Sequence, residues 1–353
     1  MLKQIDMKFT LKSIRAKLLV YILSTSAVLY IISVGYVSFK AKSIALENAK
    51  KLTDEYAKKY ANETKANLNV DMDVTRTLAQ AFKDFIDMPV KARDSISKQM
   101  IYNIIKENPE FLSVWLHWEL YYSDPDYNKP FGRVRNTYYR INNSIKFRKD
   151  TMDTHGDQVG GLYYRIKTGK EEVVTDPYFY SYTNSEEDRF LETSVCVPIL
   201  RNGEFIGLMG IDLDLVRFQK IIENISPFEG SYAFLLANDG SFVAHPKKEY
   251  VGESIFDQFP DDNTRQKFQE ILNEGNHFSY VRENTQGGRS YVSYAPVFIG
   301  KTDTPWSFGM VIPLNVIMEE ANRNFWVSLF VGLTGLIVLT LIIWIIARNI
   351  SNP

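Results

Sequence analysis

Residues 18–39 read LLVYILSTSAVLYIISVGYVSF and residues 325–347 read FWVSLFVGLTGLIVLTLIIWIIA, two apolar stretches without Asp, Glu, Lys or Arg. About 20 apolar residues in a helix span the roughly 30 Å hydrocarbon core of a bilayer, so both stretches are long enough to cross a membrane. The sequence therefore predicts two transmembrane helices. They flank a polar region, residues 40–324, which we expect to fold on one side of the membrane.

Basic residues near the first apolar stretch indicate its orientation. Residues 1–17 contain Lys3, Lys8, Lys12, Arg15 and Lys17, an excess typical of a cytoplasmic tail. The apolar stretch is longer than the roughly 7–15 residues of a signal-peptide core, and no small-x-small cleavage site follows it, which favours an uncleaved anchor. Residues 40–324 are thus predicted to be extracytoplasmic.

Composition argues against several function classes. The net charge is −1, so the basic surface typical of nucleic-acid-binding proteins is not expected. Cys196 is the only cysteine, which excludes an intrachain disulfide, and its apolar neighbours predict a buried core residue. Residues 124–128 resemble the start of a calcium loop, but Lys129 replaces the glycine that such a loop needs. We find no catalytic constellation, and no cofactor or metal site is expected.

The polar region begins with helical patterns. Residues 40–88 contain no glycine, and apolar residues recur every three or four positions, which predicts one long stalk helix continuing from the membrane. Pro89 ends it. A second amphipathic helix follows, and residues 108–109 (Asn-Pro) close it.

Alternating patterns then replace helical ones. Residues 113–120 read as a strand with Trp115, His117 and Glu119 on one face. Hairpins are predicted for residues 131–140 with 144–148 and for residues 192–200 with 204–215, where Asp212 points away from Ile211. Further strands are predicted at residues 231–237, 241–246, 275–283, 289–297 and 305–312. The fold class is α/β (α+β), with a long N-terminal helix and two related modules of antiparallel sheet, residues 89–225 and 226–322.

Several short motifs in this order are similar to a known family. They are GLYY (161–164), TDPY (175–178), VCVPI (195–199), residues 203–212, NDG (238–240), His245-Pro246 and PWSF (305–308). Residues 40–320 resemble the double-Cache (dCache_1, PAS-like) extracytoplasmic sensor domains of bacterial transmembrane receptors, such as methyl-accepting chemotaxis proteins and sensor histidine kinases. The resemblance implies two stacked PAS-like modules in a two-pass protein of the bacterial cytoplasmic (inner) membrane. It implies a homodimer, and residues 348–353 would begin a HAMP linker to cytoplasmic signalling partners.

The resemblance also implies a ligand site in the membrane-distal module, residues 89–225. The matching positions are Tyr163, Tyr164, Tyr178 and Asp212. Trp115 and His117 share a sheet face with the expected pocket. The open alternative for the tyrosines is core packing. For Asp212 the alternatives are a solvated strand carboxylate and a carboxylate paired within the protein.

Ligand identity stays open between an amino acid, an amine and another small metabolite. Gly161 stands where amino-acid-binding members carry an arginine that holds the ligand carboxylate. Arg165, Arg140 or Arg135 would have to supply that cation. Two other function classes remain as alternatives: an ectoenzyme, and a structural or protein-binding ectodomain.

Overall fold

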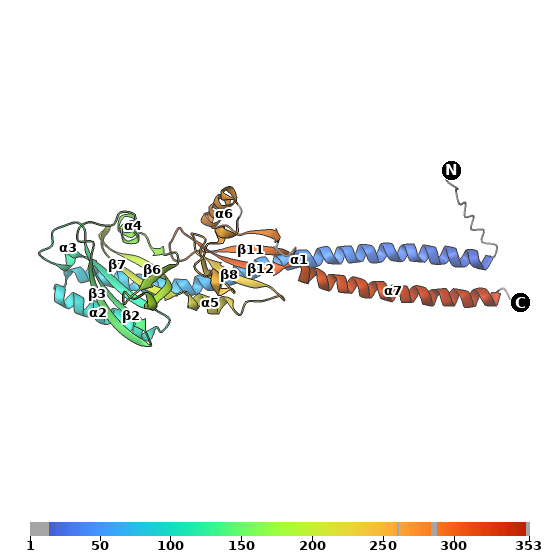
Figure 1. Ribbon diagram of the computed structural model, residues 1–353, viewed down its shortest axis with the longest axis horizontal. Coiled ribbons are helices and arrows are strands. Elements are labelled where there is room, and N and C mark those ends of the chain that lie inside the picture. The colour runs from blue at the N-terminus through green and yellow to red at the C-terminus, as the bar shows by residue number, and fades with distance from the viewer. Residues whose placement is uncertain (1–13, 260, 284–287, 351–353) are drawn as a thin grey trace. The chain divides into compact units, whose positions relative to one another are not determined.

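The computed structural model describes residues 14–259, 261–283 and 288–350 (Figure 1). The chain divides into two compact units: residues 1–52, 283–290 and 313–353 form one, and residues 53–282 and 291–312 form the other. Two predicted features lie outside the described residues: most of the basic N-terminal tail (residues 1–13) and residues 351–353 of the expected HAMP linker.

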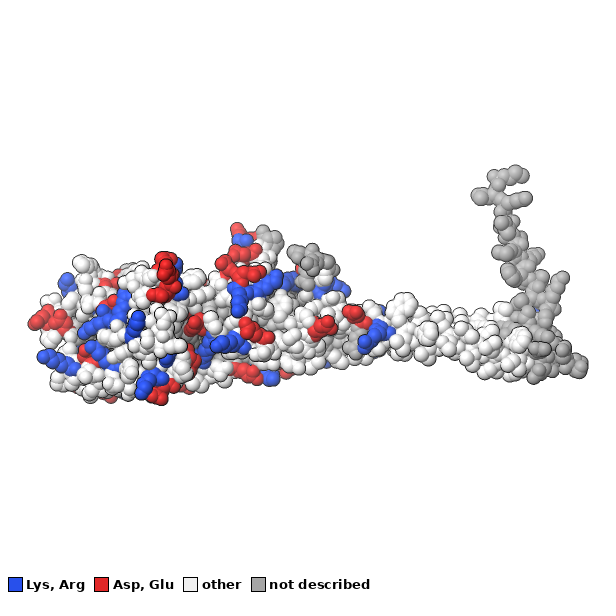
Figure 2. All heavy atoms as spheres, turned by 60° about the horizontal axis from the view of Figure 1, so that its bottom comes forward, with Lys and Arg blue, Asp and Glu red and all other residues white. Residues whose placement is uncertain are grey.

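The first unit contains the two apolar helices. They are the N-terminal part of α1 (Ile14–Phe82) and α7 (Leu314–Ile350), and both are long and apolar enough to cross a membrane. Large apolar side chains such as Tyr36 and Phe330 are about 70% exposed along them. Figure 2 shows long uncharged surface on these helices, whereas positive and negative side chains are interspersed elsewhere. An apolar surface of this extent fits a lipid environment.

The second unit is built along the C-terminal part of α1. Five of the six residues in the predicted three-four pattern, Leu68, Met72, Thr75, Leu78 and Phe82, are buried on α1, and the sixth, Phe85, is partly buried just beyond the end of α1. The 3₁₀ helix η1 (Lys83–Asp87) follows, and Pro89 is the N-cap of α2 (Val90–Glu107). Proline suits this boundary because it has no backbone N–H to leave unpaired.

The first sheet is antiparallel and has the strand order β3-β2-β1-β7-β6-β4, with β5 also pairing with β6. Both predicted hairpins are present. Asn142 and Asn143 adopt positive φ in the tight β2–β3 turn, as do Asn202 and Gly203 in the β6–β7 turn. The strands are β1 (Ser113–Glu119), β2 (Arg133–Ile141), β3 (Ser144–Met152), β4 (Val173–Val174), β5 (Tyr178–Ser181), β6 (Arg189–Arg201) and β7 (Glu204–Asp214).

Three short helices belong to this sheet: α3 (Leu120–Ser123), α4 (Leu162–Gly169) and the 3₁₀ helix η2 (Glu186–Asp188). Leu120 was expected in the strand, but it begins α3. Its side chain is nevertheless buried with Leu116 and Trp118 in the core, as the alternation predicts.

The second sheet has the order β10-β11-β12-β8-β9. Its strands are β8 (Tyr232–Leu236), β9 (Phe242–Ala244), β10 (Phe278–Glu283), β11 (Arg289–Val297) and β12 (Trp306–Pro313). The helices around it are α5 (Val216–Ile222), η3 (Lys248–Tyr250), η4 (Ile255–Gln258) and α6 (Asp262–Glu274). The architecture is thus the predicted mixture of helix and antiparallel sheet. The exact domain boundaries remain predictions.

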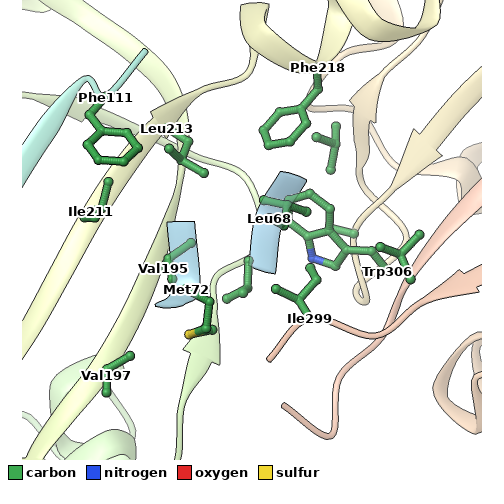
Figure 3. Close-up of a cluster of buried hydrophobic side chains, with 14 of the residues drawn as sticks. Leu68, Met72, Phe111, Val195, Val197, Ile211, Leu213, Phe218, Ile299 and Trp306 are labelled. Carbon is green, nitrogen blue, oxygen red and sulfur yellow. The ribbon is translucent and has the colours of Figure 1, made fainter. Parts of the chain in front are cut away.

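The largest hydrophobic cluster joins both sheets to α1 (Figure 3). Leu68 and Met72 of α1 lie among Ile211 and Leu213 of β7 and Trp306 of β12. One face of the first sheet is therefore occupied by core packing. Because strand residues alternate between faces, their neighbours along β1, β6 and β7 point to the opposite face.

Candidate functional site

The opposite face of the first sheet borders a cavity of about 560 Å³. This volume lies within the roughly 300–1,000 Å³ typical of small-molecule sites. Strands β1, β2, β6 and β7 form one wall, α4 and the segment around β5 form another, and Asn238 and Thr304 also contribute. All six predicted site residues line the cavity: Trp115, His117, Tyr163, Tyr164, Tyr178 and Asp212.

Of these six side chains, Asp212 forms the most hydrogen bonds. Its Oδ1 accepts hydrogen bonds from Trp115 Nε1 at 2.8 Å and Ser194 Oγ at 2.6 Å. Its Oδ2 accepts from the Tyr182 hydroxyl at 2.7 Å and from Ser113 Oγ. The side chain is 3% exposed. Both carboxylate oxygens are therefore held by the protein, so Asp212 organises the cavity wall whether or not it also contacts a ligand.

Glu192 is a second buried carboxyl on the same wall, which sequence reasoning missed. Its Oε2 lies 2.8 Å from the Tyr182 hydroxyl, which also bonds to Asp212. Burial is the main cause, and the nearby Asp212 carboxylate the second, of a pKa of Glu192 raised to about 9. The alternation along β6 signals its orientation, because Glu192 shares a face with Ser194.

Aromatic rings form much of the cavity surface. The ring of His117 lies 4.8 Å from that of Trp115 and is stacked 5.5 Å from that of Tyr163. Burial, with Arg133 and Arg135 nearby, lowers the pKa of His117 well below its usual value, so the imidazole is neutral at pH 7. These rings can hold an apolar group of a ligand by flat contact.

The hydroxyls of Tyr163 and Tyr178 are hydrogen-bonded within the protein. Tyr163 donates to Glu119 Oε1 at 2.6 Å, and Glu119 is also paired with Lys167 at 3.0 Å. The Tyr178 hydroxyl lies 2.6 Å from Ser194 Oγ. Because Ser194 already donates to Asp212, it accepts the proton of Tyr178. Their hydrogen bonds fix the orientation of both rings at the cavity surface.

The predicted replacements for the missing arginine differ in position. Arg165 and Arg135 line the cavity. Arg140 does not: strand alternation places it on the other face, where it donates to Ile105 O at 2.6 Å, so that prediction was wrong. Arg133, which sequence reasoning did not single out, also lines the cavity, and its guanidinium lies 3.9 Å from the centre of the Tyr163 ring.

These cations differ in how their charge is balanced. Arg135 is paired with Asp150 at 2.9 Å, and Arg133 is paired with Asp153. Arg165 is exposed, and its side chain forms no hydrogen bond or ion pair among the described residues. It lies one helical turn after Gly161 on α4, and helical side chains lean toward the N-terminus of their helix. Arg165 is therefore the cation most available to an anionic group near Gly161.

Several residues that line the cavity have a buried polar atom with no hydrogen-bond partner among the residues that the structure describes. These atoms are His117 Nδ1, Thr137 Oγ1, Glu192 Oε1 and Arg133 Nε. An unsatisfied buried polar atom costs about 1–3 kcal/mol, so such atoms are rare in a finished core. Among the residues that the structure describes, no group of three or more His, Cys, Asp or Glu side chains is arranged to hold a metal ion.

The model of the Cache domain dCache_1 matches residues 41–321, most of the chain. The chain belongs to the Cache-domain family. The curated relatives are methyl-accepting chemotaxis proteins of Pseudomonas species. The methyl-accepting chemotaxis protein TlpQ of Pseudomonas aeruginosa is 22% identical over 308 residues, which cover 78% of this chain and 42% of TlpQ.

Solved sensor and ligand-binding domains share the fold. An extracellular domain assigned to the histidine kinase mmHK1S-Z2 has a TM-score of 0.61 and 25% identity, covering 78% of this chain and 99% of that domain. The periplasmic sensory domain of the Campylobacter jejuni chemoreceptor Tlp1 has a TM-score of 0.59 and 17% identity, covering 78% and 98%. The ligand-binding domain of the Pseudomonas fluorescens chemoreceptor CtaA, solved with L-isoleucine, has a TM-score of 0.53 and 16% identity, covering 80% and 99%.

The two apolar helices and these relatives together fit a membrane protein with an extracytoplasmic Cache sensor domain. The chain spans less than half the length of the curated relatives that it matches.

Proposed function

We propose that this chain is the sensory and transmembrane region of a bacterial receptor, and that the cavity beside the first sheet binds a small molecule with a cationic nitrogen. An amino acid is the first candidate, and an amine is the second. The observation that carries the proposal is a cavity of ligand size, several of whose lining residues have buried polar atoms without partners among the described residues. A ligand that fills the cavity would satisfy them.

The charges around the cavity support a zwitterionic ligand. Asp212 and Glu192 form an acidic region on β6 and β7, where an ammonium group would be stabilised. Arg165 would hold the ligand carboxylate in place of the arginine that Gly161 cannot provide. Tyr164 and Tyr178 would enclose the apolar part of the ligand. CtaA, which shares the fold, was solved with L-isoleucine, and this supports an amino acid as the first candidate.

A thermal-shift panel tests the proposal. The full chain in lipid nanodiscs would be heated with each of the twenty common L-amino acids, and with putrescine, agmatine, histamine and ethanolamine. A ligand at 100 times its Kd adds about 2.7 kcal/mol of stability. At about 2 °C per kcal/mol for a domain of this size, Tm rises by about 5 °C. A panel without any such shift would contradict the proposal.

The receptor topology is part of the same proposal. Residues 40–324 would lie outside the bacterial cytoplasmic membrane, and ligand binding would shift α7 by about 1–2 Å within a homodimer. The shift would pass through a HAMP-type linker, beginning at residues 348–353, to a cytoplasmic output domain.

Cysteine labelling tests the topology. The natural Cys196 is buried and should not react with the reagent, so the exposed Lys146→Cys would be the sole reactive thiol. We expect a membrane-impermeant maleimide to label Lys146→Cys in intact cells. Labelling only after lysis would refute the orientation.

A further inference from the structure

Glu192 lies near the start of β6 and is fully buried. Its register partner on β7 is Asp214, Asp212 is nearby on the same strand, and Tyr178 of β5 pairs with it on the other side. The groups that face it are therefore two carboxyls and the hydroxyls of Tyr178 and Tyr182. No Lys, Arg or His side chain forms an ion pair with Glu192 in the part of the chain that the structure describes.

The hydrogen-bond geometry requires a proton on Glu192. The Tyr182 hydroxyl lies 2.8 Å from Glu192 Oε2 and 2.7 Å from Asp212 Oδ2. A phenol has one proton, so it can donate to only one of the two carboxyls. The other contact is a hydrogen bond only if that carboxyl donates to the phenol oxygen. The two oxygens of Asp212 already accept three other hydrogen bonds, which leave no free position for a proton that Asp212 would donate, so the proton belongs to Glu192.

This arrangement leaves one acceptor beside the cavity without a partner. Glu192 is one of the residues that line the cavity, and its Oε1 is buried and has no hydrogen-bond partner among the described residues. Both oxygens of Asp212 already accept two hydrogen bonds each. A donor group of a ligand that reaches this wall would therefore find Glu192 Oε1 unoccupied and Asp212 saturated.

We propose that Glu192 is the carboxyl that holds the cationic nitrogen of the ligand, and that it releases its proton when this group binds. The inference rests on the proposed function, which requires a ligand with such a nitrogen. In the step, the ligand ammonium keeps its protons and donates to Oε1, the O–H bond at Oε2 breaks, and the proton leaves to solvent. The positive charge of the ligand then balances a carboxylate that burial alone disfavours.

Proton release makes binding depend on pH. Below the pKa of about 9 for Glu192 in the empty site, each bound ligand displaces about one proton. The apparent Kd then falls by up to about tenfold for each unit that the pH rises, or about 100-fold between pH 6 and pH 8. In Glu192→Gln no proton can be released, so we expect weak binding that varies little over this range.

The first measurement needs no ligand. Infrared spectra of the full chain in nanodiscs are expected to show a protonated-carboxyl band at pH 7. The band should disappear in Glu192→Gln and remain in Glu187→Gln, the same change at an exposed position of η2. A band that is unaffected by Glu192→Gln, or absent from the wild type at pH 7, would overturn the inference.

The second measurement is calorimetric titration at pH 6, 7 and 8, with the member of the thermal-shift panel that raises Tm most. Wild type and Glu187→Gln should release about one proton per ligand at pH 7, seen as a binding enthalpy that depends on the ionisation enthalpy of the buffer. Glu192→Gln should release none. If the wild type binds without proton release, the role of Glu192 is wrong and the sensor function stands. If no panel member binds, the proposed function falls, and this inference falls with it.

Discussion

Substituting Asp212 with asparagine separates the structural role of this residue from any contact with a ligand. The carboxylate accepts four hydrogen bonds, two on each oxygen. Asparagine keeps one oxygen and places an NH₂ group against the other two donors. A hydrogen bond to a charged group contributes about 1.5–3 kcal/mol, so losing two would cost about 3–6 kcal/mol. Hydroxyl donors can rotate to accept instead, which favours the lower end of this range.

The assay is thermal unfolding of the full chain in nanodiscs without ligand. At about 2 °C per kcal/mol, we expect Asp212→Asn to lower Tm by about 6 °C or more. Asp214→Asn is the matched control on the same strand: Asp214 Oδ1 accepts from Val216 N at 2.9 Å, and asparagine keeps that oxygen. The control should melt within about 1 °C of the wild type, because its contacts are preserved. If Asp212→Asn has the same Tm as the wild type, the hydrogen-bond network described for the cavity wall is wrong.

Three further substitutions test the cavity, its cation and the core. In Gly210→Ala the new Cβ would lie 2.1 Å from the ring of Trp115. We therefore expect thermal unfolding to show a free energy of unfolding lower by about 1–3 kcal/mol, and calorimetry to show weaker ligand binding. Arg165→Gln should weaken binding of a carboxylate-bearing panel member by about 10- to 100-fold with unchanged Tm, and Lys146→Gln should change neither; equal affinity would exclude Arg165 as the carboxylate partner. Leu68→Ala, at a fully buried position on α1, should lower the free energy of unfolding by about 2–5 kcal/mol without changing the Kd of the ligand. A Tm equal to that of the wild type would contradict the core assignment.

Much of the fold could be predicted because local patterns and tertiary packing agree. The three-four spacing of apolar residues in the glycine-free stalk predicts the buried face of α1. The alternation of residues predicts the two faces of β1 and β7. The Asn142-Asn143 and Asn202-Gly203 turns specified both hairpins of the first sheet, since these residues tolerate positive φ. The end of β1 was less predictable: Leu120 keeps the alternating pattern, yet it already belongs to α3.

The site could be predicted only in part. Alternation and family resemblance brought together the six residues that line the cavity, and the same alternation separates Arg135 from Arg140, five positions further along β2. Tyr182 follows β5, and its contact with Glu192 depends on how β5 pairs with β6, which no local pattern reveals. The proton on Glu192 likewise follows from three side chains that meet only in the folded protein.

A structure of the chain determined with the strongest binder from the thermal-shift panel tests the central claim most directly. The account predicts that the ligand lies in the cavity between Tyr163 and Asp212, with its cationic nitrogen within hydrogen-bond distance of Glu192 Oε1. A ligand bound outside this cavity, or a cavity that stays empty beside a saturating ligand, would contradict it.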